Sequence, residues 1–302
     1  MSIKKINKVG IVGAGTMGRR IAYGCVIKGK ETRLYDIAPE ALKSAQQAIQ
    51  VLIEERIAQR KLPEDILEKA LSLLSVKSSL SECVRGVDLV VETVPESLEL
   101  KRKVFAEIDR YADPETIIGT NTSSIPGSRL ADVTSRPEKV FNFNWGPPDD
   151  LKVEVMGNPQ TSAEIIEAVL NFLEELGMIP ILVKKEILGY ATNRIWRAIK
   201  KECLFLIAGG YISAEDIDRG WMLEWGTSLG PCGLMDIVGL DVVHDIEMIY
   251  YNESKDPSDK PPQFLVEMIK AGKLGVKSGE GFYKYPNPAY KQPNFIRGKK
   301  ES

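Results

Sequence analysis

The sequence has little cysteine and little histidine, and neither is spaced as a metal site requires. Its 302 residues include four cysteines and one histidine. The cysteines lie far apart and form no C-x-x-C pair; they are Cys25, Cys83, Cys203 and Cys232. This spacing argues against a disulfide scaffold and against a metal centre, and it fits a reducing compartment.

Long apolar runs and an excess of one charge are also absent. No apolar run reaches the roughly 18 residues of a membrane-spanning helix, and the polar start of the chain does not resemble a signal peptide. The formal net charge is -2 at pH 7, so neither nucleic acid nor an acidic membrane surface is predicted as a partner. We expect a soluble, cytoplasmic protein.

Strand-like and helix-like segments alternate over the first two thirds of the chain. Strands are predicted at 9–12, 32–35, 88–92, 116–119, 139–142, 152–156 and 179–183, and helices at 17–28, 38–59, 64–74, 98–111 and 163–176. This alternation is typical of an α/β fold with a mostly parallel sheet. Beyond residue 189 the periodicity is helical. We therefore place a Rossmann-type domain at 1–185, an all-helical domain at 186–290 and a loose tail at 291–302.

A glycine-rich loop follows the first predicted strand. Gly13, Gly15 and Gly18 form a G-x-G-x-x-G pattern with Thr16 and Met17 between them, and a helix follows. Gly13 permits a tight turn, Gly15 lets the backbone approach a pyrophosphate, and Gly18 lets helix pack on strand. The loop's N–H groups and the positive end of the helix are expected to bind that pyrophosphate.

An acidic residue at the end of the second predicted strand selects the cofactor. Asp36 can accept hydrogen bonds from both hydroxyls of an adenosine ribose, and its charge repels a 2′-phosphate. The next residues, Ile37 and Ala38, offer no cation to offset that repulsion. The sequence therefore predicts NAD rather than NADP.

Several ordered stretches resemble the 3-hydroxyacyl-CoA dehydrogenase family over nearly the whole chain. Besides the glycine loop they are V-V-E-T-V-P-E at 90–96, N-T-S-S at 121–124, V-E-V at 153–155, G-Y-A-T-N-R at 189–194, G-P at 230–231 through G-L-D at 239–241, and G-V-K-S-G-E-G-F-Y at 275–283. The resemblance implies oxidation of a 3-hydroxyl to a ketone, a place in fatty acid metabolism and a helical domain that mediates dimerisation. It also implies that Glu96, Lys101, Ser123 and Lys277 touch cofactor or substrate.

The family's active centre is a His–Glu pair with a serine and an asparagine nearby. Histidine suits removal of the hydroxyl proton because its pKa lies near neutrality, and the carboxylate fixes its tautomer. The resemblance places Ser123 and Asn193 at the substrate oxygens and the glutamate at Glu154. The histidine's place is taken by Asn142, which cannot exchange a proton near pH 7. The one histidine, His244, is expected to be structural.

The helix that opens at Asn193 offers substitutes for the histidine. Arg197 and Lys200 follow at i+4 and i+7, on one helix face. We hypothesise that Arg197 binds a substrate carboxylate and that Lys200, with a pKa lowered by burial and by Arg197, accepts the proton. Glu154, buried without a histidine, is a second candidate base. The alternative is that both cations lie on a solvated helix face.

Three functions remain open from the sequence. The default is NAD-dependent interconversion of a 3-hydroxyl and a 3-keto group on a 3-hydroxyacyl-CoA, such as 3-hydroxybutyryl-CoA. The family's CoA contacts fall on Leu52 and Gln59, so a free hydroxy acid, such as a sugar acid or carnitine, is an alternative substrate. A catalytically silent NAD-binding sensor or scaffold is the third. The chain length and head group of the substrate, the direction of flux and an oligomer beyond the expected homodimer are left open.

Overall fold

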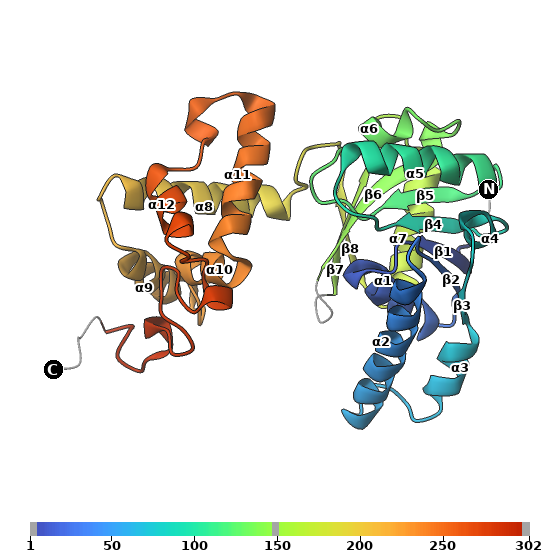
Figure 1. Ribbon diagram of the computed structural model, residues 1–302, viewed down its shortest axis with the longest axis horizontal. Helices are drawn as coiled ribbons and strands as arrows, with labels where there is room; N and C mark the ends of the chain where they lie inside the picture. The colour runs from blue at the N-terminus through green and yellow to red at the C-terminus, as the bar shows by residue number, and fades with distance from the viewer. Residues whose placement is uncertain (1–4, 147–150, 298–302) are drawn as a thin grey trace. The chain divides into compact units, whose positions relative to one another are not determined.

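A computed structural model of the protein describes residues 5–146 and 151–297. The chain divides between Ala191 and Thr192 into a first unit that holds the named strands and a second unit that is helical (Figure 1). The sequence placed this division near residue 185, within the stretch 184–191 that joins the last strand of the sheet to the first helix of the second unit and is called the linker below.

One sheet organises the first unit. Its strands are β1 (Lys8–Val12), β2 (Glu31–Tyr35), β3 (Leu74–Val76), β4 (Leu89–Glu92), β5 (Ile117–Thr120), β6 (Val140–Trp145), β7 (Lys152–Gly157) and β8 (Ile179–Val183). Their spatial order is β3-β2-β1-β4-β5-β6-β7-β8, and every neighbouring pair is parallel except β6 and β7. The strand order reverses beside β1, which is where open α/β sheets bind ligands. The predicted Rossmann-type class is confirmed.

Helices cover both faces of this sheet (Figure 1). They are α1 (Thr16–Val26), α2 (Pro39–Ala58), α3 (Ile66–Ser72), α4 (Leu80–Val84), α5 (Leu98–Tyr111), α6 (Ser128–Ala131) and α7 (Ala163–Glu175). Ile21 of α1, Ile49 of α2 and Phe172 of α7 share one buried core, and Phe105 of α5 anchors a second core on the other face. Strands β4 and β5 are buried throughout because they have a helix layer on each side.

One short strand and two short α-helices of the first unit, β3, α4 and α6, were not predicted. Strand β3 occupies 74–76, where the sequence indicated the end of a helix, and α4 spans only five residues. A three-residue edge strand is too short to show an alternating pattern, so its pairing with β2 decides its conformation.

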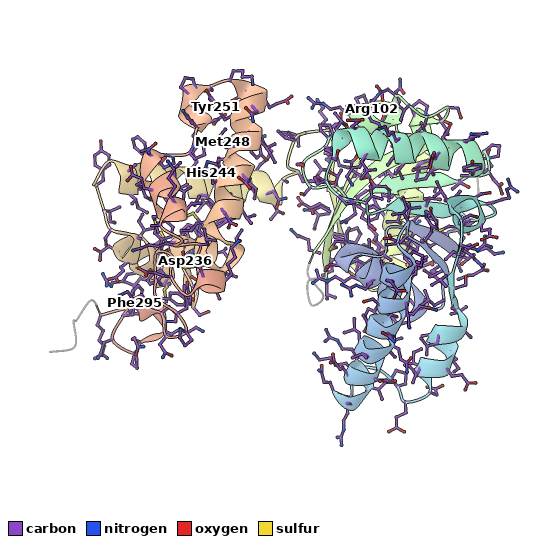
Figure 2. All side chains as sticks on the ribbon, in the orientation of Figure 1. Arg102, Asp236, His244, Met248, Tyr251 and Phe295 are labelled. Atoms are coloured by element: carbon purple, nitrogen blue, oxygen red, sulfur yellow. The ribbon has the colours of Figure 1, made fainter. Side chains whose placement is uncertain are left out.

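The second unit is built from helices α8 (Thr192–Ala208), α9 (Ala214–Trp225), α10 (Pro231–Val238), α11 (Leu240–Ser254) and α12 (Gln263–Lys270). Two buried aspartates, Asp218 of α9 and Asp236 of α10, each accept two backbone N–H groups and one tyrosine hydroxyl. Asp236 is labelled in Figure 2. The hydroxyls come from Tyr283 and Tyr285, at 2.9 and 3.0 Å. Burial raises the pKa of both aspartates. These bonds tie the segment after α12 to the helical core.

Two aromatic residues near the end of the described chain pack on the second unit, one just before and one within the predicted loose tail at 291–302. Tyr290, in the 3-10 turn Ala289–Lys291, and Phe295 are both buried. Figure 2 labels Phe295. Arg219 donates its Nε–H to the Phe295 carbonyl at 2.7 Å, and its guanidinium lies 5.0 Å from the Phe295 ring centre. Phe295 thus gives the described part of the predicted tail one buried aromatic contact with the second unit. The part of the predicted tail at 298–302 lies outside the described residues.

The four cysteines are buried and unpaired. Burial raises the pKa of Cys25 and of Cys83 to about 12 and that of Cys203 to about 11. Within 5–146 and 151–297, no group of three potential metal-binding side chains is found. In the same residues no helix combines the length and apolar character needed to cross a bilayer.

Candidate active site

The glycine loop connects β1 to α1 and leaves an open cradle at its centre. Gly13 has a φ of 110°, and a Cβ there would lie 2.6 Å from Thr93 Oγ1. A Cβ on Gly18 would lie 1.9 Å from the Gly13 carbonyl oxygen. A Cβ on Gly15 would meet no atom within 4 Å. Gly13 and Gly18 are therefore required by the fold, whereas Gly15 faces open space.

The open space at Gly15 adjoins the N-terminus of α1. Gly15 is the N-cap residue, no side chain caps the first turn, and no acidic side chain lies in it. Thr16 and Met17 begin the helix. Uncapped N–H groups and the helix dipole attract an anion that approaches as closely as glycine allows. The cradle fits the pyrophosphate of a dinucleotide.

Asp36 is held beside this cradle, one residue past β2. Its Oδ2 accepts the Ala14 N–H at 2.7 Å, and its Oδ1 accepts the Ala38 N–H at 2.9 Å. Ile37 between them is 90% exposed. A fixed carboxylate at this position suits the two hydroxyls of an unphosphorylated ribose. The residues present fit NAD.

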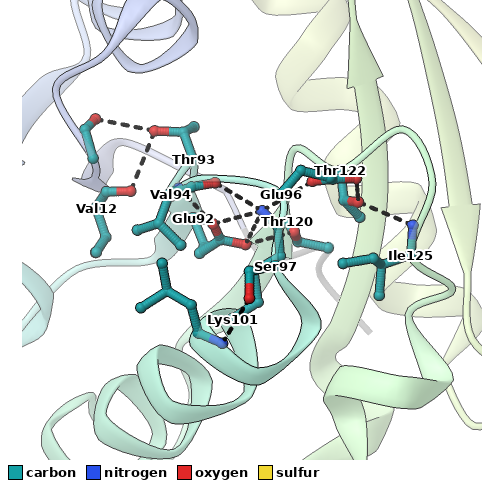
Figure 3. A network of polar contacts seen from close by, with 12 residues as sticks. Val12, Glu92, Thr93, Val94, Glu96, Ser97, Lys101, Thr120, Thr122 and Ile125 are labelled. Carbon is teal, nitrogen blue, oxygen red and sulfur yellow. Dashed lines mark hydrogen bonds and ion pairs between the residues drawn. The ribbon is translucent and has the colours of Figure 1, made fainter. Parts of the chain in front are cut away.

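Lys101 lies in a buried ion pair at the carboxyl end of β4 (Figure 3). Its Nζ lies 2.8 and 3.0 Å from the two carboxylate oxygens of Glu92, 3.1 Å from the Val94 carbonyl oxygen and 3.5 Å from Glu96 Oε2. Lys101 and Glu92 are inaccessible to solvent. Direct contact of Lys101 with a ligand, which the resemblance implies, does not fit this burial. Glu92 was missed from the sequence, although an acid that ends the apolar strand L-V-V-E requires a buried counter-charge.

Glu96 braces the turn that carries Ser123. Its Oε1 accepts the hydroxyl of Thr122, the Ser124 hydroxyl at 2.6 Å and the Ser124 N–H at 3.1 Å. Burial opposes ionisation of Glu96, but the hydrogen bonds from Ser124 and Thr122 and the charge of Lys101 outweigh it and lower the pKa of this carboxyl. Ser123 itself is exposed. The family's serine position is therefore accessible on a turn that an ionised carboxylate holds.

Asn142, which the resemblance predicts at the family's histidine position, is buried in β6. Its Nδ2 donates to the Ile125 carbonyl at 2.9 Å. Its Oδ1 has no hydrogen-bond partner among the described residues, and a Cβ on Gly127 would lie 2.1 Å from that oxygen. The amide packs directly against the backbone that follows Ser123.

Glu154, the family's glutamate position, is buried in β7 opposite Asn144. Its Oε1 accepts the Ala191 N–H at 3.1 Å, and its Oε2 accepts the Asn144 Nδ2–H at 3.4 Å and lies 3.7 Å from Lys152 Nζ. The register of β6 and β7 places Asn142 and Glu154 on one face of the sheet. The two positions are thus neighbours, as the resemblance requires, but each is bonded to other groups.

Arg197 and Lys200 form ion pairs within the second unit. Arg197 donates to Glu247 Oε2 at 2.9 Å and to Asp259 Oδ1 at 2.8 Å, and it covers the ring of Tyr250 at 4.0 Å. Lys200 Nζ lies 3.3 Å from Glu247 Oε1, and its side chain is buried. Burial lowers the pKa of Lys200 against the opposing charge of Glu247, with a smaller contribution from Arg197.

These ion pairs bear on the roles predicted for Arg197 and Lys200. The direction expected for the Lys200 pKa is found, but the solvated face is not, because Lys200 is buried and the Arg197 side chain is only 14% exposed. The guanidinium of Arg197 already binds two carboxylates. These bonds compete with the predicted binding of a substrate carboxylate to Arg197. The partners, Glu247 and Asp259, lie far along the chain, and no local pattern indicated them.

Three other residues of interest belong to the second unit. Asn193 is the second residue of α8 and is half-buried. Lys277 Nζ lies 2.6 Å from Asp241 and is partly exposed. His244 of α11 (Figure 2) contacts Asp245 Oδ1 at 3.1 Å. Their relation to a ligand remains a prediction from the family resemblance.

Comparisons with known proteins agree with this geometry. The NAD-binding domain of 3-hydroxyacyl-CoA dehydrogenase matches residues 8–187, and the C-terminal domain of the same family matches residues 189–285. A 3-hydroxybutyryl-CoA dehydrogenase of Bradyrhizobium diazoefficiens is 32% identical over 93% of this chain and 96% of its own. A 5-formyl-3-hydroxy-2-methylpyridine 4-carboxylate 5-dehydrogenase of Mesorhizobium japonicum is 30% identical over 93% of this chain and 91% of its own.

A solved structure resembles this chain over nearly its whole length. The (S)-3-hydroxybutyryl-CoA dehydrogenase of Ralstonia eutropha superimposes with a TM-score of 0.88 at 34% identity, over 94% of this chain and all of the other. Both halves of the chain, and not the glycine loop alone, therefore carry the likeness. The protein belongs to the 3-hydroxyacyl-CoA dehydrogenase family, whose members are NAD-dependent oxidoreductases acting on CH–OH donors.

Proposed function

We propose that this protein interconverts a 3-hydroxyl and a 3-keto group with NAD, and that a 3-hydroxyacyl-CoA is its default substrate. The observation that carries the proposal is the open cradle at Gly15 with Asp36 fixed beside it. Family membership and the exposed Ser123 on its braced turn support the same assignment. The Ser123 hydroxyl is proposed to hydrogen-bond the reacting oxygen of the substrate.

The hydroxyl proton is proposed to leave to solvent water. NAD, when bound, supplies the acceptor for the hydride that leaves the carbinol carbon. The O–H bond must break as well, but the Asn142 amide cannot accept its proton. Lys200 is ion-paired with Glu247, and Glu154 is bonded to Asn144 and Ala191. The proposal gives no side chain the role of proton acceptor, so the substrate hydroxyl must lose its proton to solvent before hydride transfer. The rate of oxidation should therefore rise about tenfold per pH unit, without the plateau between about pH 6 and 8 that a histidine base would produce.

A free hydroxy acid is the second candidate substrate. The resemblance places the family's CoA contacts on Leu52, within α2, and on Gln59, its C-cap, and neither is a cation. The nearby cations Arg56, Arg60 and Lys61 are the alternative contacts for CoA. The Mesorhizobium relative, which is named for a pyridine carboxylate, supports the same alternative. Arg197, the residue that the sequence offers for a carboxylate, is engaged by Glu247 and Asp259. For that reason we place the thioester first.

The test compares these substrates directly. NADH formation at 340 nm is measured with 3-hydroxybutyryl-CoA and with free hydroxy acids from pH 6 to 10, with NADP as the matched cofactor control. We expect turnover with the thioester and NAD, rising with pH. Turnover with free acids alone would support the second candidate. Binding of NAD without turnover of any substrate in either direction would leave a silent NAD-binding module and refute the proposal.

A cytoplasmic homodimer is the proposed state of the protein. Leu223, Trp225 and Ile237 on α9 and α10 are each more than half exposed, and apolar side chains in such numbers are typical of subunit interfaces. The buried, unpaired cysteines support a reducing compartment. Light scattering behind size-exclusion chromatography measures the mass, and a monomer at micromolar concentration would refute the dimer.

A further inference from the structure

The turn that carries Ser123, residues 122–127, is held from three directions. From the β4 side, Glu96 accepts the hydroxyls of Thr122 and Ser124. From the linker between the units, the Tyr190 hydroxyl donates to the Thr122 carbonyl at 2.9 Å. From β6, Asn142 Nδ2 donates to the Ile125 carbonyl at 2.9 Å. The backbone on both sides of Ser123 is thus fixed, while Ser123 is exposed.

The linker is fixed by the same group of residues. Gly189 and Tyr190 have φ values of 80° and 52°, and the left-handed region costs a non-glycine residue about 1–2 kcal/mol. Tyr190 persists there because its ring is buried and its hydroxyl is bonded. The next N–H, of Ala191, donates to Glu154 at 3.1 Å. Asn193 follows two residues later.

We propose that Asn142, Tyr190 and Glu154 are positioning residues, which fix the Ser123 turn and the linker ahead of Asn193. The proposal rests on the proposed function, because it assigns Ser123 and Asn193 to substrate. Asn142 is buried and donates to a carbonyl, so it acts on substrate through the turn and not by contact. The position at which the family places its proton acceptor has become a hydrogen-bond donor that holds backbone in place.

Chemistry explains why asparagine suits this role. Its Nδ2 always carries two hydrogens, whereas a neutral histidine carries one N–H whose ring position depends on the tautomer. Gly127 leaves the amide just enough room, since a Cβ there would lie 2.1 Å from Asn142 Oδ1. Tyr190 reinforces the arrangement: burial raises the pKa of its phenol, so its hydroxyl stays a donor to Thr122 at every pH used in an assay.

The first test removes one hydroxyl. Tyr190→Phe keeps the ring but removes the hydroxyl that donates to the Thr122 carbonyl. We expect kcat to fall about tenfold, the change in rate that corresponds to the free energy of one hydrogen bond. The KM for NAD and the slope of log kcat against pH should not change, because neither the cradle nor the proton path is touched. The control is Tyr285→Phe, which removes a hydroxyl from Asp236 in the second unit and should leave kcat unchanged. A Tyr190→Phe enzyme with a new kinetic pKa would instead make Tyr190 part of the proton path and overturn the proposal.

The second test does not require turnover. Amide hydrogen exchange over 122–127 should become at least about tenfold faster in Tyr190→Phe, while exchange in α1 stays as in the wild type. Unchanged exchange in this turn would refute the positioning role even if the protein proved to be a silent NAD-binding module.

The third test is Asn142→His. It should lower kcat, and a gain in kcat with a plateau near pH 6.5 would show a vacant base position and refute the proposal.

Discussion

Gly15→Ala separates cofactor binding from folding more cleanly than any other change in the glycine loop. The added Cβ meets no protein atom within 4 Å, and the Gly15 backbone, at φ -69° and ψ -166°, is open to alanine. As an N-cap, alanine is less favourable than glycine, which lowers the free energy of unfolding by some tenths of a kcal/mol. Alanine also has fewer conformations in the unfolded chain, which raises the free energy of unfolding by about 0.4–1 kcal/mol. The two effects nearly cancel, so the free energy of unfolding should stay within about 0.5 kcal/mol of the wild type.

Binding of the cofactor should respond very differently. The pyrophosphate must approach the Gly15 backbone where the new methyl group would stand. We expect the Kd for NADH to rise at least about tenfold, which is about 1.4 kcal/mol. Gly18→Ala is the contrast, because its Cβ would lie 1.9 Å from the Gly13 carbonyl oxygen and should cost about 1–3 kcal/mol of stability.

Isothermal titration with NADH and urea unfolding measure the two quantities on the same preparations. The matched control is Gly220→Ala in α9, where a Cβ also meets nothing within 4 Å; it should gain about 0.5–1 kcal/mol of stability and leave NADH affinity unchanged. A Gly15→Ala protein that binds NADH as tightly as the wild type would show that no pyrophosphate rests on this loop. The reasoning from the open cradle would then be wrong.

Three other changes test the cofactor edge, the buried ion pair and the helical core. Asp36→Asn removes the charge that repels a 2′-phosphate, so the ratio of the Kd for NADPH to the Kd for NADH should fall by about tenfold or more. An unchanged ratio would show that Asp36 does not select the cofactor. Lys101→Met leaves the buried charge of Glu92 without a partner and should cost about 3–5 kcal/mol in urea unfolding, part of which Glu92→Gln should restore when added. Asp236→Asn should cost about 1–3 kcal/mol because Tyr285 and a backbone N–H lose their acceptor. Because burial raises the pKa of Asp236, its favourable contribution is complete below the unfolded pKa and is lost as pH rises through the folded value. Asp236→Asn should therefore show a less negative slope of stability against pH above about pH 4, and parallel slopes would contradict the pKa shift.

Local patterns were sufficient for most of the first unit. The glycine loop, the strand before it and Asp36 each follow from neighbouring residues, and α5 has the predicted bounds 98–111. Such features could be predicted because strand, turn and helix signals act over a few positions. The loose tail at 291–302 stays a prediction; within its described part, 291–297, Phe295 is buried, and no pattern in the neighbouring residues indicated that contact.

Long-range electrostatic partners could not be predicted. Arg197 and Lys200 were correctly placed on one helix face, yet Glu247 and Asp259, which neutralise them, come from another helix and a later turn. The hydrogen bond from Asn142 to Ile125 is a second example, because it joins β6 to the turn after β5. The sequence can predict that an asparagine stands at the family's histidine position, but what the Asn142 side chain contacts is a property of the fold.

The four buried cysteine thiols can report unfolding of this protein, because they react with alkylating reagents only when they become exposed. Thiolates react with alkylating reagents, and a thiol with a pKa of about 12, as in Cys25 and Cys83, is almost wholly unreactive at neutral pH. These two cysteines lie in the first unit, whereas Cys203 and Cys232 lie in the second. Mass-spectrometric pulse labelling could therefore time the opening of each half separately, without any engineered probe.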